Sequence, residues 1–237
     1  MQAVVLAGGK GTRLKPYTNI LPKPLMPLGD LSILEILLMQ LKQSGVTEVI
    51  LSCGYLNHII RAIFDNGEKN GILIKYSIEE KPLGTAGPLS LVIEDLKENF
   101  LVLNGDVLTN LNFKKLYQFH VSTEAAATIC IKRREVKIDF GVIESDNDKF
   151  LNYEEKPQYN FDVSMGVNVF NKNMIKKYIK SKDYLDIPDL INLLKKNNLP
   201  IKCFRDDCEW LDIGRIDDYE RAIEIFEKNK RSFLKEN

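Results

Sequence analysis

Histidine, cysteine and tryptophan are scarce in this chain of 237 residues, which has two, four and one of them respectively. No stretch approaches the roughly 18 consecutive apolar residues that a membrane-spanning helix needs. Neither sign of charge is in excess, because 33 lysines and arginines balance 33 aspartates and glutamates. This balance argues against a nucleic-acid partner or a polybasic membrane anchor, and leaves open a local basic site for a phosphate-bearing ligand.

The cysteines form no CxxC pair, and no histidine lies near them at metal-ligand spacing. Cys53 and Cys130 lie in apolar runs and are expected in the core. Cys203 and Cys208 are close enough in sequence to approach each other, but free thiols in a reducing compartment are the favoured interpretation. The N-terminus has no basic segment ahead of its apolar residues, so it is not typical of a signal peptide. These features predict a cytoplasmic protein.

Short β-branched runs alternate with amphipathic segments, which is typical of an α/β fold with a mostly parallel sheet covered by helices on both faces. Strands are expected at 3–7, 48–53, 71–76, 100–103, 126–131, 141–144, 151–154, 164–170 and 201–204. Helices are expected from an N-cap at Ser32 to 44–45, and at 59–64, 86–96, 187–196 and 216–230. The lysine-rich segment 229–237 is expected to fray. No linker or repeat is visible, so residues 1–237 are expected to form one domain.

A glycine-rich turn follows the first predicted strand directly, with the sequence Leu6-Ala7-Gly8-Gly9-Lys10-Gly11-Thr12-Arg13-Leu14. Glycines let backbone N–H groups approach a phosphate chain closely. The spacing fits neither a P-loop nor a dinucleotide fingerprint, because Leu14 stands where the latter needs its third glycine. The cations Lys10 and Arg13 favour a triphosphate ligand, but a purely structural turn with solvated charges is an equal alternative on spacing alone.

With Pro22-Lys23-Pro24-Leu25, this turn resembles the signature of the sugar-nucleotide pyrophosphorylases, which join an NTP to a sugar 1-phosphate. The resemblance continues through Pro82-Leu83-Gly84-Thr85, Leu103-Asn104-Gly105-Asp106, Glu154-Glu155-Lys156-Pro157 and Trp210-Leu211-Asp212-Ile213-Gly214. It is greatest to the mannose-1-phosphate and heptose-1-phosphate guanylyltransferases. It implies a Rossmann-like three-layer fold and a sugar-1-phosphate nucleotidyltransferase activity. Many members carry a C-terminal β-helix domain, which is not expected here.

The resemblance also implies the residues that bind the nucleotide. Arg13, Lys23 and Asp106 are the expected catalytic residues, since they would neutralise or position phosphate charge during attack on the α-phosphorus. The full expected nucleotide site consists of Leu6, Ala7, Gly8, Gly9, Gly11, Thr12, Arg13, Lys23, Glu79, Pro82, Gly84, Thr85, Asn104, Gly105 and Asp106. No covalent nucleophile is needed, so His58 and His120 are expected to be ordinary surface or core residues.

A magnesium ion is the expected cofactor, with Asp106 and Asp212 as its two carboxylate ligands by resemblance. Magnesium prefers few carboxylates together with phosphate oxygens and water. Asp106 also comes directly after a buried strand, where open α/β sheets bind ligands. The alternatives are a turn-forming role for Asp106 and a capping role for Asp212 ahead of the helix after Gly214.

The base is expected to meet Glu79 or Glu80, which stand just before the Pro82 loop. A carboxylate can accept both the N1–H and the 2-amino group of guanine, which favours GTP over UTP, dTTP or ATP. The alternative is that both glutamates face solvent beside Lys81.

The sugar phosphate is expected, by the same resemblance, to be bound by Gly141, Glu155, Lys156 and Gly166. Ser164 and Met165 depart from the Asn-Ala-Gly pattern of the family, which leaves glucose, mannose and a heptose open as the sugar.

The competing functions are a glucose-1-phosphate thymidylyl- or uridylyltransferase, a noncatalytic nucleotide-sugar sensor, a dinucleotide-dependent oxidoreductase, and a transferase acting on a non-sugar phosphate. The expected partners are an NTP and a sugar 1-phosphate, and a homo-oligomer is left open. No membrane partner is expected.

Overall fold

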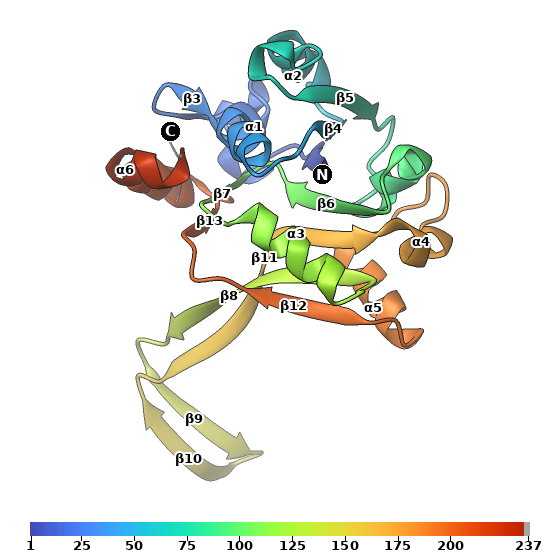
Figure 1. Cartoon of the computed structure of the whole chain (residues 1–237). Coiled ribbons are helices and arrows are strands. Elements are labelled where there is room, and N and C mark those ends of the chain that lie inside the picture. Colours follow the sequence, from blue (N-terminus) through green and yellow to red (C-terminus); the bar gives the residue numbers. More distant parts are fainter. Residues whose placement is uncertain (235–237) are drawn as a thin grey trace.

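A seven-stranded sheet forms the centre of the computed structural model, which describes residues 1–234 (Figure 1). Its strand order is β12-β8-β11-β6-β1-β4-β5. The strands are β1 (Gln2–Ala7), β4 (Glu48–Cys53), β5 (Leu73–Ile78), β6 (Asn99–Asn104), β8 (Ala127–Lys137), β11 (Gln158–Asn171) and β12 (Ile201–Arg205). Strand β11 pairs antiparallel with β6 and β8, and the other four pairings are parallel. The prediction of a mostly parallel mixed sheet is therefore confirmed.

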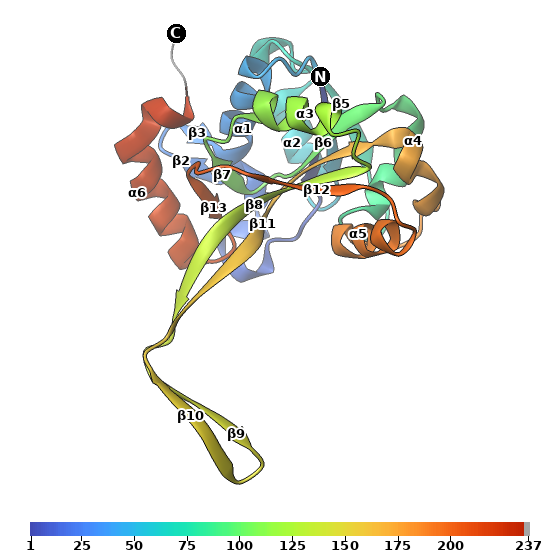
Figure 2. The same cartoon turned by 60° about the horizontal axis from the view of Figure 1, so that its bottom comes forward.

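Helices cover both faces of the sheet, so the fold has three layers (Figures 1 and 2). Alternate side chains of β1 point to opposite faces, with Val5 in one apolar cluster and Val4 in the other. The Val5 face packs against α1 (Ile33–Gln43), α2 (Asn57–Phe64) and α3 (Phe113–Ser122). The Val4 face packs against α4 (Lys172–Ile175), α5 (Ile187–Lys196) and the 3₁₀ helices η5 (Gly87–Leu91) and η6 (Ile93–Asp95).

A third apolar cluster joins the C-terminal helix α6 (Ile216–Phe233) to the short strands β13 (Trp210–Asp212) and β7 (Val107–Thr109). The hairpin of β2 (Pro27–Leu28) and β3 (Leu31–Ser32) contributes Leu28 to it. Phe233 and Leu234 are only 1% and 4% exposed, because they pack in this cluster. The predicted frayed segment is therefore wrong for residues 229–234, and residues 235–237 lie outside the described part of the chain.

Helix α1 begins where the sequence predicts, because Ser32 and Glu35 form a capping box: Glu35 N–H donates to Ser32 Oγ, and Ser32 N–H donates to Glu35 Oε2. The single helix predicted after residue 85 is instead the pair η5 and η6, interrupted at Val92, whose φ of −130° is not helical. No element is predicted for residues 107–125, but β7 and α3 form there. Helix α3 buries Phe113, Leu116 and His120, and the polar histidine weakens the apolar pattern.

Strands β8 and β11 continue past the sheet as a two-stranded ribbon that projects from the rest of the chain (Figures 1 and 2). The ribbon bends near residues 138–140 and 156–157 and continues as β9 (Gly141–Asp146) paired with β10 (Lys149–Glu155). We call residues 132–163 the arm. Its outer part is exposed, with Phe140 at 77%.

All four cysteines are free thiols, as predicted, with Cys53 and Cys130 in the core. Within residues 1–234, the helices are all too short or too polar to cross a bilayer.

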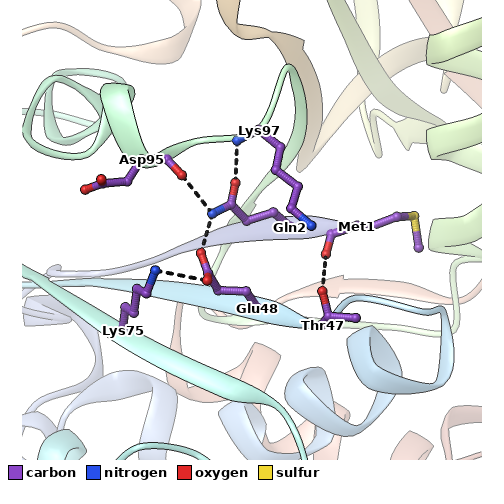
Figure 3. A network of polar contacts seen from close by, with 7 residues as sticks. All are labelled: Met1, Gln2, Thr47, Glu48, Lys75, Asp95 and Lys97. Atoms are coloured by element: carbon purple, nitrogen blue, oxygen red, sulfur yellow. Dashed lines mark hydrogen bonds and ion pairs between the residues drawn. The ribbon is translucent and has the colours of Figure 1, made fainter.

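Gln2 anchors the start of β1 through a network of polar contacts (Figure 3). The glycine turn follows the other end of the same strand. Its side chain is 1% exposed. Its amide nitrogen donates to the Glu48 carboxylate and to the Asp95 carbonyl at 3.2 Å, and its amide oxygen accepts from Lys97 N–H at 2.6 Å. Lys75 pairs with the same carboxylate at 3.0 Å. One side chain thus ties β1 to β4 and to the loop before β6.

We expect Gln2→Ala to lower the free energy of unfolding by about 1–3 kcal/mol, because the Asp95 carbonyl and the Lys97 amide lose their buried partner. Urea denaturation measures the difference. Gln118→Ala, on the exposed side of α3, is the matched control and should change stability by less than about 0.5 kcal/mol. Equal losses in the two variants would contradict the anchoring role of Gln2.

Candidate active site

The carboxyl ends of β1, β4 and β6 meet at one edge of the sheet, and the candidate site is built there. Gly105 N–H, after β6, donates to Leu6 O of β1 at 2.9 Å. Glu79 N–H, after β5, donates to Cys53 O at the end of β4 at 2.9 Å. These bonds bring the glycine turn, the Asn104-Gly105-Asp106 segment and the Glu79 segment to a common edge, which is where open α/β sheets bind ligands.

Gly8 faces the Glu79 side chain across this edge. A Cβ on Gly8 would lie 2.7 Å from Glu79 Oε1, so only glycine fits without displacing the carboxylate. That oxygen also accepts a hydrogen bond from Ser52 Oγ at 3.4 Å, while Oε2 accepts from Leu83 N–H at 3.0 Å. Burial raises the pKa of Glu79, although these two hydrogen bonds oppose the shift. Glu80 is exposed, so Glu79 is the glutamate that lies against the turn.

The glycine turn ends in a short 3₁₀ helix, η1 (Thr12–Leu14), that begins after Gly11. Gly11 O accepts hydrogen bonds from Thr18 Oγ1 at 2.8 Å and from Leu14 N–H at 2.9 Å, which fix the backbone. A Cβ on Gly11 would lie 3.2 Å from Lys23 Cβ. Lys23 starts the 3₁₀ helix η3 (Lys23–Leu25) and is therefore held directly beside the glycine turn.

Lys23 forms an ion pair with Asp106, and both side chains are largely buried, at 11% and 23% exposed. Asp212 lies nearby because β13 pairs with β7, which places Asp212 opposite Val107, and Ile213 N–H donates to Asp106 O at 3.3 Å. Desolvation and the neighbouring Asp106 carboxylate raise the pKa of Asp212, although Lys23 and Arg13 partly oppose this. Two carboxylates are thus held close together beside two cations.

This pair of carboxylates fits a magnesium ion. Asp106 Oδ1 is buried and has no hydrogen-bond partner, while Oδ2 pairs with Lys23. Among the residues described, no cluster of three or more histidine, cysteine or acidic side chains could hold a metal on its own. A site with two carboxylates and open positions is the kind that takes Mg²⁺ together with substrate phosphate oxygens. Asp106 and Asp212 are the residues that would hold it.

Arg13 lies over Gly214, with Nη2 3.5 Å from the position that a Cβ on Gly214 would take. The end of β13 and the start of α6 therefore leave room for this guanidinium group beside Asp212. The structure brings Arg13, Lys23, Asp106 and Asp212 together from segments far apart in the chain.

The Pro82 loop is held by the segment before α5. Asp186 Oδ1 accepts hydrogen bonds from Thr85 N–H at 2.9 Å and from Thr85 Oγ1 at 3.1 Å. Thr85 Oγ1 in turn accepts from Ile187 N–H at 2.8 Å. Ser52 and Asp186, which position Glu79 and this loop, are absent from the predicted site. Only Asp186 has a sequence signal, as an acidic residue just ahead of a helix with proline in its first turn.

The residues predicted for the sugar phosphate fall into two groups. Gly166 has a φ of +70°, and a Cβ there would lie 2.6 Å from Asn104 Nδ2, so this glycine brings β11 against the end of β6 at the site edge. Gly141 and Glu155 instead pair with each other on the outer part of the arm, and Lys156 is exposed beside its bend. The Glu155 carboxylate accepts a hydrogen bond from Tyr153 OH at 2.8 Å.

A glycine-rich turn and two neighbouring carboxylates at the carboxyl ends of the strands of a mostly parallel sheet are typical of the Rossmann-like α/β proteins that bind nucleotides. The chain belongs to the nucleotidyl transferase family, whose model matches residues 2–229.

Two relatives and one solved structure are similar over nearly all of this chain. A UTP–glucose-1-phosphate uridylyltransferase from Synechocystis is 34% identical over 94% of this chain, which spans 62% of that protein's length. The D-glycero-alpha-D-manno-heptose 1-phosphate guanylyltransferase of Aneurinibacillus thermoaerophilus is 31% identical, over 94% of this chain and 96% of its own. HddC from Yersinia pseudotuberculosis, complexed with GMP-PN, has a TM-score of 0.72 and 29% identity, covering 95% of this chain and 99% of its own.

We expect Asp212→Asn to raise the urea midpoint of unfolding at pH 7 in EDTA, because it removes a charge that both desolvation and the neighbouring Asp106 carboxylate disfavour. A carboxyl whose pKa is raised by folding destabilises the folded protein once it is ionised. The gain should therefore vanish near about pH 3, below the ordinary pKa of aspartate, and grow as the pH rises. Asp148→Asn, in the exposed turn between β9 and β10, is the control. A midpoint for Asp212→Asn that stays at or below the wild-type value at every pH would show that folding does not disfavour the ionised form of Asp212.

Proposed function

We propose that this chain is a sugar-1-phosphate nucleotidyltransferase that uses GTP and a mannose- or heptose-type sugar 1-phosphate. The convergence of Lys23, Asp106, Asp212 and Arg13 beside the glycine turn carries this proposal. A phosphate oxygen of the sugar 1-phosphate attacks the α-phosphorus of the NTP. The bond from that phosphorus to the β-phosphate oxygen breaks, and pyrophosphate leaves with the electron pair. The products are the NDP-sugar and pyrophosphate.

The residues divide this task by charge. Two polyanions must approach each other, so fixed cations contribute most when they are in place before the substrates meet. Lys23 and Arg13 supply positive charge at the phosphate chain, and the N–H groups of the glycine turn contact its oxygens. Asp106 and Asp212 hold Mg²⁺, which screens the charge of the α-phosphate when bound. On this proposal Gly166 and the arm residues Gly141, Glu155 and Lys156 serve the sugar phosphate, and Asn104 belongs to the nucleotide site.

The base preference follows from the placement of Glu79. Its carboxylate lies at the glycine turn, is half-buried, and keeps lone pairs beyond the two that accept from Ser52 and Leu83. Guanine offers it two adjacent donors, whereas thymine and uracil present one donor between two acceptors. The heptose guanylyltransferase among the relatives supports GTP.

The second candidate is a glucose-1-phosphate uridylyltransferase, which the 34% identical Synechocystis relative favours. The two candidates share the phosphate and metal machinery and differ only in the base and the sugar. We also propose that residues 1–237 act as one catalytic domain in the cytoplasm.

A panel of four NTPs, each with glucose, mannose and heptose 1-phosphates in Mg²⁺, tests the activity through pyrophosphate release. We expect release with at least one pair, and a loss of at least about 100-fold in kcat for Asp106→Asn, because the metal and Lys23 lose their charged partner. Asp30→Asn removes an exposed carboxylate that pairs with Lys230 and should leave kcat unchanged. Absence of pyrophosphate from every pair would overturn the transferase proposal in favour of a nucleotide-sugar sensor.

Glu79→Gln tests the base. The amide keeps the shape of the side chain but replaces one acceptor oxygen with a donor, so kcat/KM with GTP should fall about tenfold relative to UTP or dTTP. Glu80→Gln, at the exposed neighbour, should leave the ratio as it is. If both variants keep the wild-type ratio, Glu79 does not read the base.

A further inference from the structure

A cavity of about 530 Å³ lies between the base of the arm, β13 and the start of α6. Arg13 and Asp212 form part of its wall, so it opens directly beside the candidate active site. Six of its lining residues are lysine or arginine and three are acidic. Because the whole chain has a formal net charge of zero, this excess of positive charge is a local feature.

The cations of this cavity are Arg13, Lys132, Arg133, Arg134, Arg215 and Arg221. Lys132 Nζ donates to the Cys208 carbonyl, and Arg133 lies opposite Asp162 on the neighbouring strand. Within residues 1–234, however, no ion pair engages the guanidinium groups of Arg13, Arg134, Arg215 or Arg221.

The acidic residues of the wall, Glu209, Asp212 and Asp218, are half as many as the cations, and none of them forms an ion pair with these arginines within residues 1–234. Asp218 accepts a hydrogen bond from the backbone N–H of Arg215 at 3.0 Å, so it caps α6. Asp212 lies near both Asp106 and Arg13, so among these arginines it offsets part of the charge of Arg13 only. Guanidinium groups stay charged at every physiological pH and bind phosphate oxygens in pairs. Unpaired arginines from separate elements around one cavity are therefore suited to a ligand with several phosphate oxygens.

We propose that this cavity binds pyrophosphate, with Arg134, Arg215 and Arg221 as phosphate-binding residues in addition to Arg13. This inference rests on the proposed function, because it assigns a place to the leaving group. A sugar ring presents mainly hydroxyl groups and would leave most of these charges unmatched, whereas pyrophosphate is a compact polyanion. Pyrophosphate departs into the cavity from the α-phosphorus, past Arg13. In the reverse reaction its oxygen attacks the α-phosphorus of the NDP-sugar from the same side, and the sugar 1-phosphate leaves.

Titration calorimetry with sodium pyrophosphate in EDTA tests the cavity without turnover, using the full chain. We expect the double variant Arg215→Gln with Arg221→Gln to weaken pyrophosphate binding at least about tenfold, since two charge-assisted contacts are lost. Arg231→Gln, on the exposed end of the same helix, should bind like the wild type. Both arginines of the double variant are exposed, so circular dichroism should show an intact fold. Equal affinities in the double variant and the wild type would overturn the proposal.

Kinetics distinguish this proposal from the proposed function. In the double variant we expect the inhibition constant of pyrophosphate to rise at least about tenfold, while the KM of the sugar 1-phosphate stays within about threefold. A rise confined to the KM of the sugar 1-phosphate would assign the cavity to the sugar and overturn the proposal. If the chain catalyses no transfer but the double variant still loses pyrophosphate affinity, the anion site stands and the transferase proposal fails.

Discussion

The close approach of two carboxylates, Asp106 and Asp212, is the constraint on which the rest of the site depends. Like charges repel, so this arrangement persists only because the backbone imposes it. The pairing of β13 with β7 sets Asp212 opposite Val107, and the apolar cluster of α6 holds β13 in place. Lys23 offsets part of the repulsion through its ion pair with Asp106. The stability of the C-terminal helix thus supports a site that would be unfavourable in isolation.

The site also depends on the register between β1 and β6 in the central sheet. Leu6 O accepts from Gly105 N–H only when β1 and β6 are paired as observed, and a shift by one residue would move the glycine turn away from Asp106. The Gln2 network at the opposite edge ties β1 to β4 and to the loop before β6 (Figure 3). Polar contacts at the start of β1 therefore help to set the geometry at the carboxyl ends of the strands, where the candidate site lies.

The sequence predicts the strands of the sheet core and most helices because their patterns are local. The apolar runs of β1, β4 and β6 and the Ser32 cap of α1 need no tertiary information. The residues between 107 and 125 were missed because β7 exists only through its pairing with β13, and α3 buries a histidine that hydrogen-bonds to Thr128 and Asn99. The burial of Phe233 likewise follows from contacts with Phe226 and α1, not from the lysine-rich sequence around it.

Some residues of the candidate site can likewise be predicted from local sequence, and others cannot. Recognisable motifs contain the glycine turn, Lys23, Asp106 and Asp212. No motif marks Ser52, Arg134 or Arg221, whose place near the site depends on how the strands and α6 pack. Arg13 and Lys23, which are expected at the nucleotide, lie at the carboxyl ends of the sheet strands, whereas Lys156, which is expected at the sugar phosphate, lies on the arm. The positions of Arg13 and Lys23 therefore do not depend on the arm. On the proposed function these two cations offset the phosphate charge of the nucleotide. Arg215, at the N-cap of α6, and Arg221, within α6, also lie outside the arm, and the apolar side of this helix packs into the third cluster. On the proposed function these cations are in place before the two anions meet, so their charge offsets the repulsion between the substrates without a rearrangement of the arm.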